Sequence, residues 1–390
     1  MRPAPSKFAY FVLEGANSFA TAYYFNYLLF LLRDRYQFGN LQNLLVVAGV
    51  GLLYIPASWF GGKFGQRHGY FASLRVGFGG LVVAMCLGWL LPSLGTMLLG
   101  LALWSASICF TWPILEALVS EHEEPRNLLN RVGQYNVVWA ATMGLAQFVG
   151  GWLFERLGPS SLFWLPVGVH ALQFVATWPL QARHDAWLAS APAAAHGELP
   201  HDAAERPAYF QRLAWIANPL AYMAINTVNA VIPGIAANLG LGVAQAGALM
   251  SVWQHVRTLS FVVLWRWPAW HYRFGWFLGS FALLLASFLV LMLTRSQAVL
   301  VAAQVGFGWA TALIYYSSLY YAMDGSDTHG EHGGIHESLI GIGICGGPAI
   351  SALTLWLSGT PAAPAAAVGT VLLAGGVWCW RVRRSAKLSN

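Results

Sequence analysis

Long apolar runs, separated by short polar connections, constrain this chain more than any other feature. Charged residues make up only 9% of its 390 residues, whereas hydrophobic residues make up 57%. A soluble domain carries roughly 25% charged residues, so this chain has too little charge to cover a water-facing surface. Twelve of the runs approach the roughly 20 apolar residues that a helix needs to cross a bilayer. The sequence therefore predicts an all-α integral membrane protein whose main partner is the lipid bilayer.

Basic residues are distributed unevenly among the predicted connections. Counted over alternate connections, 16 Lys and Arg lie on one side of the membrane and 4 on the other, with Arg257 inside a span. Because basic residues favour the cytoplasmic side, both chain termini are expected in the cytoplasm. The predicted spans are residues 8–32, 42–60, 72–92, 95–120, 131–155, 160–182, 212–238, 243–265, 275–294, 297–323, 336–357 and 362–380.

One long polar connection divides the chain into two halves. It is rich in Ala, Pro and charge, and it lacks the apolar stripe of a packed helix. We predict an N-terminal six-helix bundle over residues 1–182, a flexible cytoplasmic linker over 183–211, and a C-terminal six-helix bundle with a short basic tail over 212–390. The other connections are short, which favours antiparallel neighbouring helices.

A short sequence recurs at the same place in the two halves. GKFGQRHGYF, residues 62–71, joins predicted spans two and three, and PAWHYRFGWF, residues 268–277, joins predicted spans eight and nine. A repeat at matching positions predicts two structurally related halves. Glycine-rich stretches also occupy matching spans, GLAQFVGGW in span five and GIGICGGPAI in span eleven. Their small residues predict close helix packing.

The first repeat segment resembles a signature of the major facilitator superfamily, G-x-L-a-D-r-x-G-r-k between spans two and three. Gly62, Arg67 and Gly69 fit that signature, whereas Gln66 stands where the family has an acid. The architectural resemblance covers essentially the whole chain. It implies two six-helix bundles related by a pseudo-two-fold axis, which rock about a central site and expose it alternately to each side. In that family spans one, four, seven and ten line the site, and spans two, five, eight and eleven contribute to it.

Ionisable residues inside the predicted spans are the first candidate site residues. A charged side chain at the centre of a bilayer costs about 2.5–3.5 kcal/mol on insertion scales, so each marks a functional hypothesis. Glu14 lies in the first span, Glu116 in the fourth, and His255 and Arg257 in the eighth. Glu14 is the first candidate for a proton carrier. For Glu116 an alternative is an acid that reaches the cytoplasmic surface.

Arg257 has the most specific local pattern of these residues. Trp253 precedes it by four residues, one helical turn, and Gln254 lies beside them. A guanidinium next to an indole suits an anionic or zwitterionic substrate group, held bidentately if it is a carboxylate or phosphate. The alternative is a structural ion pair of Arg257 with Glu14 or Glu116 that holds the bundles together.

Polar and aromatic side chains on spans one, seven and ten extend the candidate site. Their amides, hydroxyls and rings suit a polar organic molecule better than a bare ion. These candidates are Asn17 and Tyr24 in span one, Tyr222 and Asn226 in span seven, and Tyr316 and Tyr320 in span ten.

Gating is predicted from the repeat segments and from the start of span eleven. The repeat supplies Gly62, Gln66, Arg67, Gly69, Arg273 and Gly275. With Gln66 in place of an acid, the latch against a neighbouring helix is expected to be weakened to a hydrogen bond. His336 and Glu337 are expected to form a cytoplasmic gate with Arg126 or Arg131.

The segment 324–337 is rich in histidines and acids and is expected to be a cytoplasmic loop. His329, His332 and His336 are weak candidates for a metal site, because spacings of three and four residues can place imidazoles on one ion. The glycines between them favour a solvated loop without a metal, and no metal or other cofactor is predicted.

Together these features favour a monomeric, proton-coupled secondary transporter of a small polar or amphipathic organic solute in a bacterial inner membrane. Nothing resembles a P-loop, and no enzyme activity or nucleic-acid partner is predicted. One alternative is a membrane-embedded enzyme, which needs a clustered histidine or nucleophile motif at one membrane face. Another is a transport-inactive sensor or assembly protein on the same fold, which the replacement at Gln66 leaves open.

Overall fold

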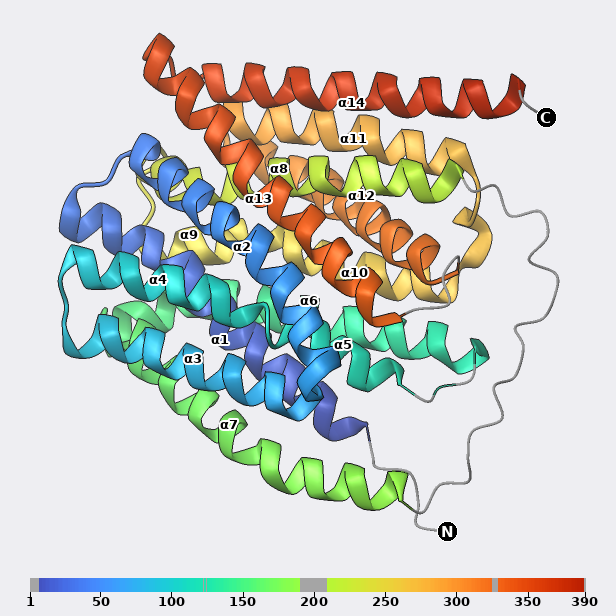
Figure 1. Cartoon of the computed structure of the whole chain (residues 1–390). Coiled ribbons are helices and arrows are strands. Elements are labelled where there is room, and N and C mark those ends of the chain that lie inside the picture. Colours follow the sequence, from blue (N-terminus) through green and yellow to red (C-terminus); the bar gives the residue numbers. More distant parts are fainter. Residues whose placement is uncertain (1–6, 122, 124, 190–208, 325–328, 389–390) are drawn as a thin grey trace.

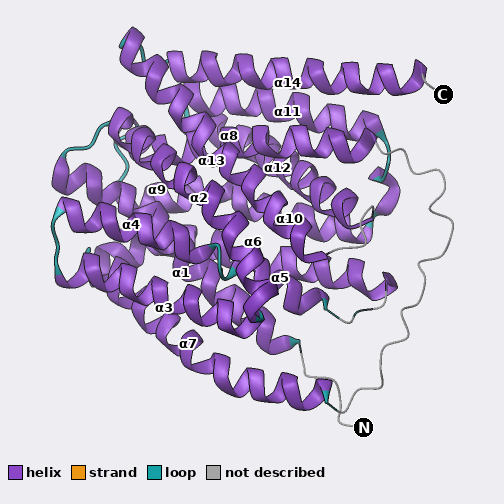
Figure 2. Ribbon diagram, in the orientation of Figure 1, coloured by secondary structure: helices purple, strands orange, loops and turns teal. Residues whose placement is uncertain are grey.

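A computed structural model of the protein describes residues 7–121, 123, 125–189, 209–324 and 329–388, without the side chains of 125–129, 322–335 and 386–388. The described residues form fourteen α-helices, one short 3-10 helix and no strand (Figures 1 and 2). Short turns connect most of these helices. The predicted all-α fold is confirmed.

Seven helices of the N-terminal half supply the first six spans. The fourth span consists of two helices, α4 and α5. The bounds are α1 (Phe8–Tyr36), α2 (Asn40–His68), α3 (Tyr70–Leu90), α4 (Leu94–Ile108), α5 (Trp112–Ser120), α6 (Pro125–Leu157) and α7 (Ser161–Leu188).

The C-terminal half also has six spans. Here the divided span is the second of the half, the eighth of the chain, which consists of α9 and α10. A 3-10 helix, Pro268–Trp270, follows α10. The bounds are α8 (Tyr209–Asn238), α9 (Val243–Met250), α10 (Val252–Arg266), α11 (Phe274–Leu293), α12 (Gln297–Asp324), α13 (His329–Ser358) and α14 (Ala363–Leu388). Helical structure therefore enters both edges of the predicted linker, up to Leu188 and from Tyr209.

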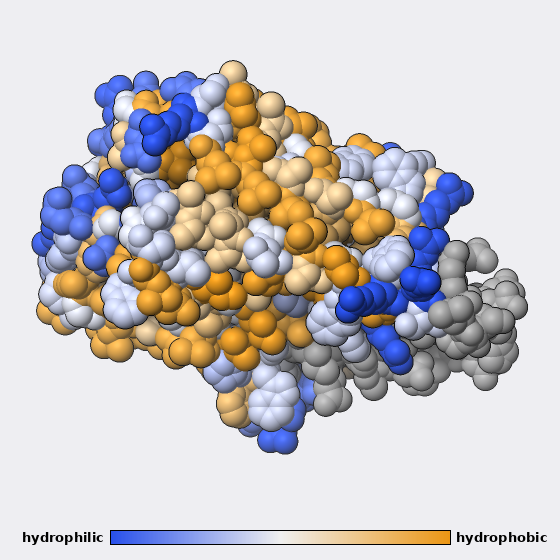
Figure 3. Space-filling view, turned by 90° about the horizontal axis from the view of Figure 1, so that it is seen from above, coloured by the Kyte–Doolittle hydropathy of each residue, from blue (hydrophilic) through white to orange (hydrophobic). Residues whose placement is uncertain are grey.

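The outer surface of the described chain matches the hydrocarbon of a bilayer. Nine helical stretches are long and apolar enough to cross a membrane, and the other three predicted spans coincide with α1, α7 and the α9–α10 pair. Figure 3 shows hydrophobic residues across the middle of one face and hydrophilic residues gathered at both ends. Large apolar side chains such as Leu172 and Trp356 are 75% and 68% exposed. Such a belt faces lipid, so the chain is an integral membrane protein.

The break between α4 and α5 is stabilised by neighbouring helices. Pro113 lacks a backbone N–H and fits the first turn of α5. The Ser73 hydroxyl donates to the Phe110 carbonyl oxygen at 3.1 Å, and Asn17 Nδ2 donates to Thr111 Oγ1 at 3.1 Å. The first bond satisfies a backbone carbonyl that a continuous helix satisfies internally, and the second ties α1 to the break through the Thr111 side chain.

The repeat segments turn the chain in two different ways. In the first half α2 continues to His68, and Gly69 turns the chain with a φ of 88° that favours glycine. In the second half Gly275 lies inside α11, and the positive φ of 52° falls at Tyr272. The segments match in sequence position but not in backbone conformation.

Glycines allow the two halves to approach closely. A Cβ atom on Gly51 of α2 would lie 2.2 Å from the backbone nitrogen of Cys345 on α13. A Cβ atom on Gly151 of α6 would lie 2.6 Å from the Cα of Ala244 on α9. Gly151 and Cys345 belong to the two glycine-rich stretches, so the predicted close packing of these spans is confirmed.

A charged network joins helices at the end of the molecule where α1 begins and α14 ends (Figure 1). The ammonium nitrogen of Lys7 lies 2.8 Å from the Val119 carbonyl oxygen, 2.7 Å from that of Glu121 and 2.8 Å from Glu123 Oε1. Arg131 Nε also donates to Glu123 Oε1, at 2.9 Å. The network therefore fastens the start of α1 and the end of α5 to α6.

Removal of the Glu123 carboxylate should destabilise the protein at neutral pH. Burial raises the pKa of Glu123, but the hydrogen bonds from Lys7 and Arg131 outweigh this effect and hold its pKa below the usual value of 4.5. A carboxyl with a lowered folded-state pKa stabilises above its unfolded-state pKa and loses that contribution as the pH falls. We expect Glu123→Gln to cost about 1–3 kcal/mol at pH 7, and to cost progressively less below about pH 4.5.

Thermal unfolding in detergent between pH 4 and pH 8 measures this effect. Asp34→Asn is the matched control, because it removes an exposed carboxylate at the opposite end. Equal unfolding temperatures of Glu123→Gln and wild type at pH 7 would contradict the prediction.

Candidate functional site

A central cavity lies between the two halves of the described chain. Its lining residues come from α1, α2, α4, α5, α6, α8, α10, α12 and α13. These helices form spans one, two, four, five, seven, eight, ten and eleven. No lining residue comes from α3, α7, α11 or α14. The spans that the family resemblance predicts to line the central site are thus the spans that surround the cavity.

Seven of the predicted substrate or coupling residues line this cavity, together with Glu337, which was predicted as a gate residue. The seven are Glu14, Glu116, Tyr222, Asn226, Trp253, Gln254 and Arg257.

Arg257 is buried in a cage of aromatic rings. Its side chain is on α10, and the residue is 2% exposed. The guanidinium carbon lies 4.7 Å from the ring centroid of Trp139, 5.1 Å from that of Tyr315 and 5.9 Å from that of Tyr222. Ring faces attract a cation and offset part of the free energy lost when its water is removed. The cage therefore holds a charge that an apolar site alone would reject.

Two donor groups of Arg257 have no partner in the described part of the chain, although its side chain also forms a hydrogen bond with Tyr222. Nε and Nη2 are buried without a hydrogen-bond partner. The alternative of an ion pair is not realised, since none of the described ion pairs involves Arg257. On the same helix, Trp253 Nε1 and Gln254 Oε1 are also buried without partners. Unpartnered buried polar groups are rare and call for a specific explanation.

Glu14 is held by hydroxyl groups rather than by a cation. It is 0% exposed. The Ser18 hydroxyl donates to Glu14 Oε1 at 2.6 Å, and the Tyr135 hydroxyl donates to Oε2 at 3.1 Å. Tyr135 comes from α6, so the carboxyl links spans one and five.

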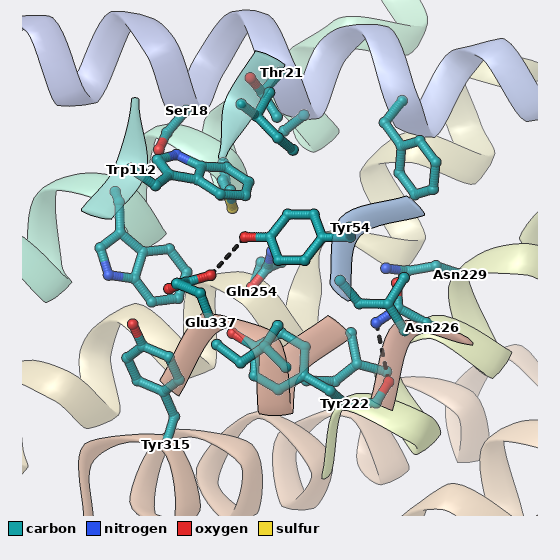
Figure 4. A pocket seen from close by; sticks show the side chains of 18 of the residues that line it. Ser18, Thr21, Tyr54, Trp112, Tyr222, Asn226, Asn229, Gln254, Tyr315 and Glu337 are labelled. Carbon is teal, nitrogen blue, oxygen red and sulfur yellow. Dashed lines mark hydrogen bonds between the residues drawn. The ribbon is translucent and has the colours of Figure 1, made fainter. Parts of the chain in front are cut away.

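Two further carboxyl groups enter the same cavity. Tyr54 on α2 donates to Glu337 Oε2 on α13 at 2.5 Å, so this short bond joins the two halves (Figure 4). Glu116 on α5 also lines the cavity, and no described residue forms a hydrogen bond or ion pair with its carboxyl. The expectation that Glu116 reaches the cytoplasmic surface does not fit this position.

The predicted gate at His336 and Glu337 requires correction. The segment expected to be a loop is helical from His329, and both residues are buried, with exposures of 4% and 7%. Glu337 bonds Tyr54 instead of Arg131, and Arg131 binds Glu123. Packing against α2 and α8 stabilises a helix that its glycines disfavour. The side chain of Arg126 lies outside the described residues.

The candidate metal ligands are only partly described. The side chains of His329 and His332 lie outside the described residues. The ring of His336 packs edge-to-face on Tyr315, with 5.7 Å between centroids. Among the described side chains no group of three potential ligands is close enough to hold a metal ion.

Five of the predicted substrate or coupling residues lie outside the cavity lining. Asn17 bonds Thr111 at the helix break, and Tyr24 packs behind the cavity with its ring centroid 5.6 Å from that of Trp104. His255 is exposed, and its Nδ1 lies 2.9 Å from the backbone oxygen of Ser251.

Tyr316 and Tyr320 pack within the C-terminal half. Their ring centroids both lie 5.6 Å from that of Trp270, and Tyr320 stacks on His271 at 4.0 Å. Tyr315, their neighbour on α12, is the tyrosine that reaches the cavity. One residue along a helix rotates a side chain by about 100°, which is enough to move it from the cavity to the bundle interior.

The repeat residues predicted to act in gating lie away from the cavity. Gln66 and Arg67 are exposed, as are Arg273 and Gly275. No described residue accepts or donates the hydrogen bond that was expected at Gln66.

Aromatic residues of spans two, four and five were missed by sequence reasoning. Tyr54, Trp112, Tyr135 and Trp139 all line the cavity. Apolar spans contain many aromatic residues, so their presence alone carried no signal. The spacing of Tyr135 and Trp139, one helical turn apart, was the available indication that they share a face.

The fold and the cavity between two helical halves define the protein as a membrane transporter of the secondary type. The family model described as Major Facilitator Superfamily matches residues 10–210, just over half of the chain. The chain therefore belongs to the Major Facilitator Superfamily. Members of this family bind small-molecule substrates within the membrane.

Two solved structures share the fold at low sequence identity. The crystal structure of the human organic anion transporter MFSD10 (TETRAN) matches with a TM-score of 0.68 and 15% identity, over 96% of this chain and 100% of that chain. A mutant form of the nucleoside transporter NupG matches with a TM-score of 0.66 and 11% identity, over 98% of this chain and 99% of that chain. No curated protein matches the sequence.

Proposed function

We propose that this protein moves a small polar or amphipathic organic solute that carries an anionic group, coupled to protons and by alternating access. We further propose a bacterial inner membrane as its location, with both termini in the cytoplasm and a monomer as the working unit. The observation that carries the proposal is the guanidinium of Arg257, buried in the central cavity with Nε and Nη2 unpartnered.

An anionic substrate group explains the free donors of α10. Nε and Nη2 of one guanidinium form the fork that binds a carboxylate or phosphate bidentately. Trp253 Nε1, four residues before Arg257, adds a third unpartnered N–H in the same cavity. The fold shared with an organic anion transporter agrees with this substrate class.

Proton coupling is supported by the three carboxyl groups that share this cavity. Charged groups are expensive within a membrane, so an anion that enters together with a proton leaves the total charge unchanged. Glu14 suits the carrier role because its two described partners are hydroxyls, from Ser18 and Tyr135, and no cation holds it permanently ionised.

Glu14→Gln should separate binding from coupling. We expect this variant to retain exchange of labelled for unlabelled solute across proteoliposome membranes, but to lose at least tenfold in accumulation driven by a pH gradient. Gluconate and glucuronate serve as labelled probes. Asp34→Asn, which removes an exposed carboxylate outside the central cavity, is the control and should accumulate solute as the wild type does.

Two outcomes would contradict the proposal. Gradient-driven accumulation in Glu14→Gln equal to that of wild type excludes Glu14 as the carrier. Absence of flux for every probe in wild-type vesicles supports a transport-inactive sensor or assembly protein on this fold.

A further inference from the structure

The central cavity has two chemically different ends. One end carries Glu337 and also Arg257, whose guanidinium carbon lies 5.9 Å from the ring centroid of Tyr222. At the other end the polar lining residues are neutral, and Asn226 and Asn229 lie across the Tyr54 ring from Trp112 and Tyr315 (Figure 4). Asn229 follows Tyr222 by seven residues on α8, which corresponds to a separation of about 10 Å along the helix.

Unpartnered polar atoms also occur among the neutral residues that line the cavity. Thr21 Oγ1, Trp104 Nε1 and Asn229 Oδ1 are buried without hydrogen-bond partners. Thr21 and Trp104 are each 3% exposed, and all three residues line the cavity. They come from α1, α4 and α8, so the two halves of the protein meet around this second polar site.

These atoms match a neutral group better than a second charge. Trp104 Nε1 donates, Asn229 Oδ1 accepts, and a threonine hydroxyl does both. An alcohol or an amide satisfies such a mixed set, whereas a carboxylate accepts only and an ammonium donates only. Trp104 stacks on Phe25 with 5.2 Å between ring centroids and 8° between ring planes, which fixes the direction of its N–H.

We propose that the substrate is an organic anion whose opposite end carries neutral hydroxyl or amide groups. Arg257 binds the anionic group, and Thr21, Trp104 and Asn229 determine specificity for the neutral end. This inference rests on the proposed function, because it takes Arg257 as the anion site. An acid without hydroxyl or amide groups leaves Thr21, Trp104 and Asn229 without hydrogen-bond partners. Buried polar groups left unpaired in this way give a site strong discrimination against an analogue.

Pairs of acids of similar size test the inference. Binding of gluconate against hexanoate, and of glucuronate against cyclohexanecarboxylate, is measured by calorimetry on the full chain in detergent. We expect the wild type to bind the hydroxylated member of at least one pair ten or more times more tightly. Thr21→Val and Asn229→Leu should reduce that preference to less than threefold.

Controls separate specificity from folding and from anion binding. Thr142→Val makes the same change on α6 outside the cavity lining, where the hydroxyl already bonds the Val138 carbonyl oxygen, and should keep the preference. Thermal unfolding without ligand should show folded protein for all variants. Arg257→Gln should lose binding of all four acids.

The outcomes of the test are distinguishable. Equal binding within both pairs by the wild type, with binding still dependent on Arg257, overturns the two-ended substrate alone. A preference that survives in both Thr21→Val and Asn229→Leu overturns the role of these residues. Binding that persists in Arg257→Gln overturns the proposed anion site, and absence of binding of all four acids contradicts both proposals.

Discussion

Arg257→Gln is expected to reduce the affinity for organic anions at least 100-fold, and Arg257→Lys to recover only part of the loss. A charge-assisted hydrogen bond contributes about 1.5–3 kcal/mol, and Nε and Nη2 can supply two of them. Lysine keeps the charge but not the planar fork, so bidentate binding is lost. Calorimetric titration with the acids used above measures the affinities. Full retention of affinity in Arg257→Lys would show that charge alone matters.

A third variant at this position distinguishes a binding role from a structural one. A buried charge without a partner costs free energy, so Arg257→Met should leave the ligand-free protein at least as stable as the wild type while binding is lost. If Arg257 held the two halves together through an ion pair, its removal would destabilise the protein by about 3–5 kcal/mol. Thermal unfolding without ligand decides between these two results.

Gly51→Leu should reduce transport at least 100-fold, because α2 and α13 can no longer meet. A Cβ atom at this position would lie 2.2 Å from the backbone nitrogen of Cys345, and backbone atoms cannot move aside as a flexible side chain can. Overpacking of this kind costs about 1–3 kcal/mol even where side chains adjust. The cost falls on the state described here, in which the two halves are in contact.

Gly49 provides the matched control on the same helix. A Cβ atom there meets nothing within 4 Å, so Gly49→Leu should transport at nearly the wild-type rate. Initial rates of labelled solute exchange in proteoliposomes are compared, with protein recovery after reconstitution as the check on folding. Wild-type rates in Gly51→Leu would show that the α2–α13 contact is not required in the transport cycle.

The helical spans followed from the chain with little ambiguity. An apolar run of about 20 residues must satisfy its backbone hydrogen bonds internally in lipid, which leaves the helix as the solution. The predicted span 212–238 corresponds to α8, Tyr209–Asn238, and the span 275–294 to α11, Phe274–Leu293. The start of α13 was placed too late because its glycines indicate a loop, and tertiary packing overrides that local preference.

Part of the cavity lining was among the residues chosen from the sequence, and three of these residues share a cause. Glu14, Glu116 and Arg257 were found because a charge inside a membrane span needs a polar environment, and the cavity supplies it. Tyr316 was chosen and Tyr315 is the residue in the cavity, because the sequence does not define which face of α12 turns inward. Rotation of a helix is set by its contacts with neighbours.

The sequence by itself determined that this chain lies in a membrane, that two related halves build it, and which ionisable groups must be sheltered from lipid. Only the tertiary structure decided that Arg257 is caged by rings from both halves instead of paired with Glu14 or Glu116. The physical reason is that the energy of a charge depends on every group within several ångströms, and those groups come from helices far apart in the chain.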